Sequence, residues 1–171
     1  MDKDTFELLV RYNKGANQQM NDIIKILSEE EWNKQFSGYF KSIHELCSHI
    51  FIRDYTVLYK FKAVNKFESL SDAYFSKEYN SSEILFKNID EYLIKRLELD
   101  NIFINFIHEI TVDDLNKEII WKNTKDIEIK IKSKIMLLHL FNHETHHRGM
   151  ISLYLELMGK ENDYSRVYTY A

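Results

Sequence analysis

Apolar residues recur every three or four positions in four long segments of the chain, which is the spacing of amphipathic helices. The segments run from Thr5 to about Ser28, from Ser42 to about Phe61, from about Ser82 to His108, and from near Ser133 to Gly159. The chain has no proline and only four glycines, so few residues in it interrupt a helix. The pattern therefore predicts an all-α fold, a four-helix bundle.

Two of these helices carry recognisable end signals. Ser42 and Glu45 have the form of a capping box at the start of the second helix. Gly159 suits the left-handed position that follows a helix. The residues of the second helix that we expect to face inward are Leu46, His49, Ile50, Val57 and Leu58.

The segments between the helices differ in character. Residues 62–81 lack a clean period and predict a long connection with at most one short helical turn, expected to cover one end of the bundle. Residues 127–131 alternate strictly between apolar and polar, and they pair naturally with residues 118–122 across the turn-forming segment 123–126. We therefore expect a small β-hairpin between the third and fourth helices.

Composition limits the class of protein further. The chain has 171 residues, 44% of them hydrophobic and 29% charged, which predicts a single domain over residues 1–171. A net charge of −4 gives no electrostatic signal for nucleic acid or a membrane as partner. Cys47 is the single cysteine. One cysteine, no signal peptide and no apolar run of about 18 residues together predict a cytoplasmic protein.

Four of the seven histidines lie between His139 and His147. His143 and His147 are four residues apart, so on a helix they share a face and can hold one metal ion. That face is otherwise apolar, with Met136, Leu140, Ile151, Tyr154 and Met158. Two readings compete, a metal site and a pair of core histidines satisfied by hydrogen bonds. His146 leaves the pairing open, because a spacing of three also shares a face.

A third ligand would have to come from another helix. His49 is the best candidate, because it lies beside the apolar face of the second helix. His44 points elsewhere and reads as a residue of the helix start or a neighbour of the site. His108 ends the third helix and is expected at the surface, and His139 is expected to be exposed or beside the site. Three imidazoles would leave coordination positions open, as in catalytic zinc sites, and they also suit nickel, iron or copper.

Residues 143–147 also match the zinc-protease pattern H-E-x-x-H, in which Glu144 would be the general base. The extended form of that pattern fails, because Met150 stands where a glycine is needed. Glu156 and Glu161 lie too far along the chain to complete the site. The protease reading is therefore disfavoured.

Several ordered motifs resemble the DinB/YfiT-like family of proposed metalloenzymes. They are Tyr12-Asn13-Lys14-Gly15-Ala16-Asn17, Ser42-Ile43-His44-Glu45 with the following LCSHIFIRDY, residues 141–149, and the tail near Tyr168-Thr169-Tyr170. The resemblance spans nearly the whole chain. It implies a four-helix bundle, often dimeric, in which His49, His143 and His147 hold a divalent metal ion.

The resemblance also bears on neighbouring residues. Met150 stands where the family commonly has glutamine. Position 144 varies between glutamate and glutamine in such proteins, which places Glu144 on the helix surface or behind the ligands rather than in the role of a base. Arg148 is expected to form a structural ion pair, with orientation of an acidic substrate as the alternative. Cys47 is expected to be a buried, inert thiol.

Three functional hypotheses follow. The first is a metal-dependent enzyme, a hydrolase or a thiol-dependent transferase, that uses zinc, nickel or iron and acts on a small molecule or a thiol. The second is a non-catalytic metal-binding or stress-related protein whose dimeric bundle is its function. The third is a helical bundle with core histidines and no metal. A homodimer is the expected assembly.

Overall fold

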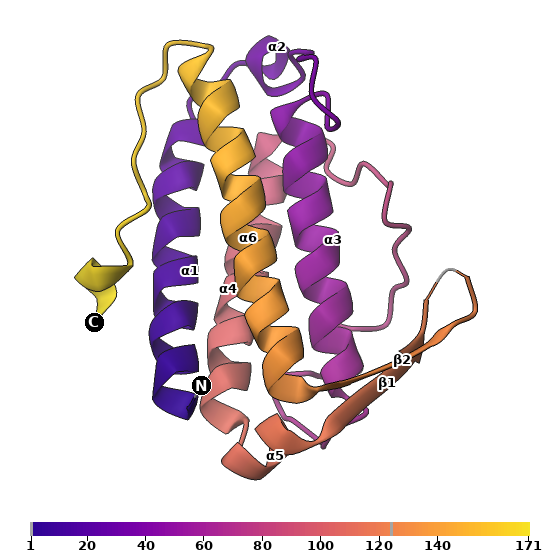
Figure 1. The fold of residues 1–171 in the computed structure, drawn as a ribbon. Helices are drawn as coiled ribbons and strands as arrows, with labels where there is room; N and C mark the ends of the chain where they lie inside the picture. Colours follow the sequence, from indigo (N-terminus) through magenta and orange to yellow (C-terminus); the bar gives the residue numbers. More distant parts are fainter. Residues whose placement is uncertain (1, 124) are drawn as a thin grey trace.

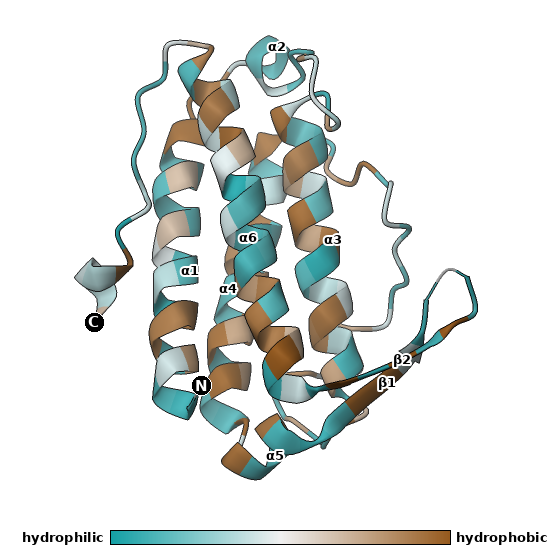
Figure 2. Ribbon diagram, viewed as in Figure 1, coloured by the Kyte–Doolittle hydropathy of each residue, from teal (hydrophilic) through white to brown (hydrophobic). Residues whose placement is uncertain are grey.

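Four long helices form the body of the protein in the computed structural model, which describes residues 2–123 and 125–171. They are α1 (Lys3–Ile24), α3 (Ile43–Phe61), α4 (Ile89–Glu109) and α6 (Ser133–Glu156). α1 packs against α4 and α6, and α3 packs against α6 and α4 (Figure 1). The predicted four-helix bundle is confirmed. Polar and apolar residues alternate along each long helix (Figure 2), as expected of helices with one buried face.

The direction of the helices explains the long connection after α3. α3 and α4 run the same way, so the chain has to return along the flank of α3 before α4 begins (Figure 1). We expected from the sequence that this connection would cover one end of the bundle. That expectation was wrong, because the connection runs along the side of α3. Phe67, Leu70, Phe75 and Phe86 of this connection are buried, so it is part of the core and not a loose loop.

The predicted start of α4 was seven residues too early. Asn88 caps the helix, its side chain accepting a hydrogen bond of 2.9 Å from the Glu91 amide, and Ile89 is the first helical residue. Before that, the Leu85 amide donates to the Ser48 hydroxyl at 3.1 Å. That bond holds the apolar residues around position 85 in non-helical backbone, although their spacing imitates a helix.

The predicted end of the first helix, near Ser28, was also wrong, because α1 ends at Ile24 and Ser28 caps the short helix that follows. The ends of the second and fourth helices agree more closely with the sequence. The Ser42 hydroxyl accepts from the Glu45 amide at 3.1 Å. The Glu45 carboxylate reaches the Lys41 amide at 2.7 Å instead of the Ser42 amide, so half of the predicted capping box forms. Gly159 has φ of 75°, the left-handed backbone predicted for the residue that follows the last helix.

Three short elements were not predicted. α2 (Glu29–Trp32) and α5 (Val112–Asn116) each begin at a complete capping box, and a 3₁₀ helix, η1 (Val167–Tyr170), lies near the C-terminus. Elements of four or five residues show too little of the helical period to be detected from it.

The predicted β-hairpin is confirmed. β1 (Glu118–Lys122) and β2 (Glu128–Lys132) pair antiparallel, with Ile120 opposite Lys130. Asp126 has φ of 59° in the turn, which aspartate tolerates; Thr124, within the predicted turn, lies outside the described residues. In the part of the chain that is described, no helix is long and apolar enough to cross a membrane.

Candidate metal centre

The packing of α3 against α6 brings three histidines together. His49 comes from α3, and His143 and His147 come from adjacent turns of α6. Each offers one ring nitrogen, and these three nitrogens lie within 4.8 Å of one another. The Nε2 atoms of His49 and His143 are 3.1 Å apart. These are the three residues singled out from the sequence.

The spacing of these nitrogens fits one metal ion. Two nitrogens bound to zinc at about 2.0–2.1 Å in a tetrahedron lie about 3.3 Å from each other. The separation of 3.1 Å between His49 and His143 is close to that value. His147 completes a set whose largest separation is 4.8 Å, so a small rotation of one ring would close the site around an ion. The cluster is therefore consistent with a metal site.

The hydrogen bonding of the rings is unlike that of structural core histidines. The buried Nδ1 atoms of His143 and His147 have no partner among the described residues. The only bond recorded between ring nitrogens of the cluster joins His49 to His143, and the backbone of Ser81 is within hydrogen-bonding reach of the His49 ring. Buried polar groups kept for structure are normally hydrogen-bonded, so these two Nδ1 atoms are exceptions. An ion held by the Nε2 atoms of His49 and His143 would not contact His143 Nδ1, so the case for a metal rests on the convergence of the three rings.

Electrostatics keeps the three rings neutral. Burial, together with His147, His49 and Arg53, lowers the pKa of His143 to about 3. Burial, His49, His146 and Arg53 lower the pKa of His147 to about 4, and burial lowers that of His49 as well. A metal ion needs neutral imidazoles as ligands, and the site supplies them at neutral pH.

The remaining histidines lie outside the cluster. The His44 Nδ1 is 3.0 Å from the Asn33 side-chain oxygen, and its ring stacks on Trp32 at 5.0 Å, which agrees with a place at the helix start. His139 and His146 are exposed on α6, and His108 is exposed at the end of α4. Burial agrees with the choice of His147 over His146 that the family resemblance implied, because His147 is buried and His146 is exposed.

Glu144 cannot act as the base of a zinc protease in this arrangement. Its side chain is fully buried and forms an ion pair of 3.0 Å with Arg148, one turn along α6. The predicted structural ion pair of Arg148 is present. Of the two positions expected for Glu144, the helix surface was wrong, because its side chain is fully buried beside Arg148 and Asp54. The alternative, a position behind the ligands, agrees with this burial.

This ion pair belongs to a larger buried network. Arg96 of α4 binds Asp54 at 2.7 Å and Asp100 at 2.8 Å, and Asp100 accepts from Asn17 at 3.0 Å. Arg148 also donates to Asn13 and Asn17. Asn13 and Asn17 belong to the motif near the N-terminus that resembles the family. This motif therefore contributes to the buried network and not to the histidine cluster.

The network holds three carboxyl groups and two guanidinium groups. Asp54 and Glu144 are close enough for a side-chain hydrogen bond, and burial and the Asp54 charge raise the pKa of Glu144 well above its usual range. One oxygen of each carboxyl otherwise lacks a partner among the described residues. One proton held between them satisfies both oxygens and makes the network neutral overall.

Sequence reasoning missed two residues that border the histidines. The Phe40 ring lies 4.6 Å from the His49 ring and 5.4 Å from the His147 ring, and the Tyr154 hydroxyl donates to the Phe40 carbonyl at 2.7 Å. Nothing in the sequence marks Phe40, which lies in a loop. Arg53 follows His49 by one helical turn, and that spacing was the available signal.

Cys47 and the aromatic tail have structural places. Cys47 is buried, and burial raises the pKa of its thiol to about 12, which agrees with the expected inert thiol. The Tyr170 ring packs edge-on against Tyr12 at 5.8 Å. Gly15 lies directly under that ring, where any larger side chain would collide with it.

Fold and site together define a four-helix-bundle protein with a three-histidine cluster between two of its helices. The model of the DinB family matches residues 1–169. The chain is also 30% identical over 151 residues to Protein DinB of Bacillus subtilis (strain 168), covering 88% of this chain and 84% of that protein. This chain belongs to the DinB family.

Two solved structures from Bacillus subtilis share the fold. The DinB-like protein YjoA aligns with a TM-score of 0.63 at 17% identity, over 90% of this chain and 94% of that one. YfiT, described as a probable metal-dependent hydrolase with an unusual four-helix bundle topology, aligns with a TM-score of 0.67 at 11% identity, over 94% of this chain and 91% of that one. At these identities the likeness concerns the fold.

Proposed function

We propose that His49, His143 and His147 bind one divalent metal ion and that the protein is a metal-dependent enzyme, a hydrolase or a thiol-dependent transferase. The observation that carries this proposal is the convergence of three neutral imidazoles, each of which offers one ring nitrogen within 4.8 Å of the others. The description of YfiT as a probable metal-dependent hydrolase supports it. Imidazole ligands suit zinc, nickel or iron.

A site with three protein ligands leaves coordination positions for a substrate or water. A bound divalent ion supplies Lewis-acid chemistry, lowering the pKa of a coordinated water or thiol. The protein's own residues prepare the surroundings. The Phe40 ring lies against His49 and His147 and keeps water from that side. Arg53 is close enough to lower the pKa of all three imidazoles, so its positive charge lies beside the proposed ion.

Metal analysis of purified protein tests the binding site. We expect about one divalent ion per chain, lost in His143→Ala and in His147→Ala. His146→Ala is the matched control, because it removes an exposed histidine from the same turn of α6. Full metal occupancy in the His143→Ala, His147→Ala double variant would refute the ligand assignment.

Activity has to be tested separately. Thiol-transfer assays and ester and amide hydrolysis assays, run on metal-loaded and metal-free protein, should give a turnover that depends on the metal. A metal-loaded protein that is inactive throughout such a panel would favour the second hypothesis, a non-catalytic metal-binding protein.

A further inference from the structure

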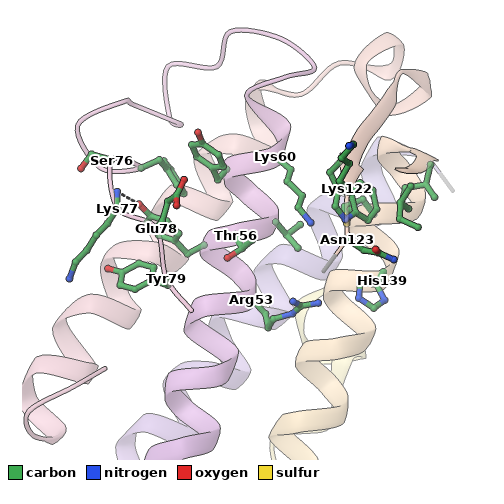
Figure 3. Close-up of a pocket in the computed structure, with 18 residues that line it drawn as sticks. Arg53, Thr56, Lys60, Ser76, Lys77, Glu78, Tyr79, Lys122, Asn123 and His139 are labelled. Atoms are coloured by element: carbon green, nitrogen blue, oxygen red, sulfur yellow. Dashed lines mark hydrogen bonds between the residues drawn. The ribbon is translucent and has the colours of Figure 1, made fainter. Parts of the chain in front are cut away.

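A cavity of about 830 Å³ opens beside the histidine cluster. It lies between the second half of α3, residues 75–79 of the long connection, the β-hairpin and the start of α6 (Figure 3). Its size is in the range of cavities that bind small organic molecules. The segments that form the cavity are far apart in the sequence, and both the hairpin and the connection contribute to its walls.

The cavity and the histidine cluster lie along the same two helices. Arg53 follows His49 by one turn on α3, and His139 precedes His143 by one turn on α6. Arg53 and His139 line the near end of the cavity, and Figure 3 shows the Arg53 side chain directed toward His139. The cavity therefore ends about one helical turn, roughly 5 Å, from the proposed metal ligands.

The charge of the cavity is opposite to that of the whole chain. The chain has a net charge of −4, but the cavity is lined by the cations Arg53, Lys60, Lys77 and Lys122 and by the single carboxylate Glu78. Lys122 is paired with Asp126 at 2.8 Å. Arg53 and Lys60 have no carboxylate partner among the described residues.

Lys60 is held in place although it lacks a counter-ion. It is half-buried, and its ammonium group lies 4.2 Å from the centre of the Trp121 ring of β1. Burial and the Arg53 charge lower its pKa. A partly desolvated cation without a partner is costly, and an anionic ligand would remove that cost.

The walls near Lys60 are apolar. Val57 of α3, Trp121 and Ile131 of the hairpin, and Met136 of α6 line the same cavity as Lys60 and His139. Lys60 follows His49 by eleven residues, so about 16 Å of helix axis separates the two. A ligand that reaches both ends has to be elongated.

We propose that this cavity binds an elongated organic anion, with its acidic group on Lys60, its apolar body against the hairpin, and its reactive end beside Arg53 at the metal centre. The reaction of that ligand rests on the function proposed above, whereas its binding does not. The shape and charge select a carboxylate or phosphate group attached to an aromatic or alkyl body.

Binding of phenylbutyrate to the metal-free and metal-loaded protein, measured by calorimetry, tests this proposal. Phenylbutanol has the same carbon skeleton without the charge, and inorganic phosphate has the charge without the apolar body. We expect phenylbutyrate to bind about tenfold more tightly than either, because a hydrogen-bonded ion pair adds to the apolar contact.

Variants locate the binding site. Lys60→Met should weaken phenylbutyrate binding by about tenfold, and Lys60→Arg, which keeps the charge, should largely restore it. Lys95→Met is the matched control, because it removes an exposed lysine of α4 outside the cavity. Unchanged binding in Lys60→Met, or an equal loss in Lys95→Met, would overturn the proposal. Equal affinity for phenylbutyrate and phenylbutanol, or no binding at millimolar concentration, would do the same.

The two proposals can fail independently. If metal-free protein binds phenylbutyrate and Lys60→Met does not, the cavity is an anion site whether or not the histidines bind metal. If His143→Ala abolishes metal binding but no variant alters phenylbutyrate binding, the metal centre stands and the anion site is refuted.

Discussion

Two polar clusters occupy neighbouring positions of α6 and yet have opposite character. His143 and His147 face α3, whereas Glu144 and Arg148, the next residue in each case, face the buried network. Both clusters lie inside a bundle that is otherwise apolar. The difference lies in whether groups of opposite charge in the chain pair with one another.

The charges of the network pair with one another within the chain, although the Arg96 Nε atom has no hydrogen-bond partner among the described residues. Two guanidinium groups meet three carboxyl groups at distances of 2.7–3.0 Å, and one proton balances the charge. The histidine cluster has three neutral rings, and the buried Nδ1 atoms of His143 and His147 have no partner among the described residues. A cluster of paired charges has a structural explanation, whereas three neutral imidazoles that converge without a charged partner point to a cation from outside the chain. This contrast is what separates the two roles.

The largest effect is expected from breaking the network. Arg148→Met leaves Glu144 and the asparagines without their cation, and removing one partner of a buried ion pair typically costs about 3–5 kcal/mol in the free energy of unfolding. Urea denaturation measures this. Arg166→Met is the control, because the ion pair of Arg166 with Asp163 is exposed and its loss should cost less than about 1 kcal/mol. Similar losses in both variants would contradict the structural role of the network.

Binding of a metal ion to the histidine cluster should stabilise the folded protein. Zinc at a free concentration 100 times its dissociation constant should raise the free energy of unfolding by about 2.7 kcal/mol. The gain should vanish in His143→Ala and persist in His146→Ala. Thermal denaturation with and without zinc measures the gain. Equal stabilisation of all three proteins would mean that zinc binds elsewhere.

The sequence allowed us to predict the histidine cluster but not the buried ionic network. Spacing along α6 identified His143 and His147, but the choice between His146 and His147 needed the resemblance to the family, and burial now supports it. The network was missed because charged residues on helices usually face solvent. Arg96 and Asp100 share a buried face with Tyr92, Leu99 and Phe103, and a charge within an apolar stripe was the overlooked signal.

Most elements of the fold could be predicted from the spacing of apolar residues. Long helices and the hairpin follow from hydrophobic period alone. The start of α4 did not, because Ile84 and Leu85 keep a helical spacing in backbone that bonds elsewhere. The cavity could not be predicted from the sequence, because it depends on how the hairpin and the connection pack against α3.

The two clusters should also titrate in opposite directions. Unfolded histidines bind protons below about pH 6.5, whereas His143 and His147 have pKa values of about 3 and about 4 in the folded protein. Their contribution to stability is therefore complete above pH 6.5 and is lost as the pH falls toward 3. Burial raises the pKa of Asp100 to about 6, so its contribution is complete below its unfolded value and is lost as the pH rises through 6.

Metal-free protein and His143→Gln, compared by denaturation between pH 7 and pH 4, isolate the histidine part. The variant should lose about 1 kcal/mol less stability than the wild type over this range, a value reduced because solvent screens the partly exposed ring. Parallel curves for the two proteins would show that His143 is not held neutral by its surroundings.

The smallest effect is expected at Glu144, the residue that the protease pattern would make essential. Because Glu144 shares a proton with Asp54, its neutral analogue in Glu144→Gln keeps both the shape and a donor toward Asp54. The free energy of unfolding should change by less than about 1 kcal/mol, and zinc affinity, measured by competition with a chelator, should stay within about twofold. His143→Gln should lose zinc binding in the same assay. A large loss of zinc affinity in Glu144→Gln would mean that the network and the metal centre are coupled through α6, and the contrast between the two clusters would fail at the residue where they meet.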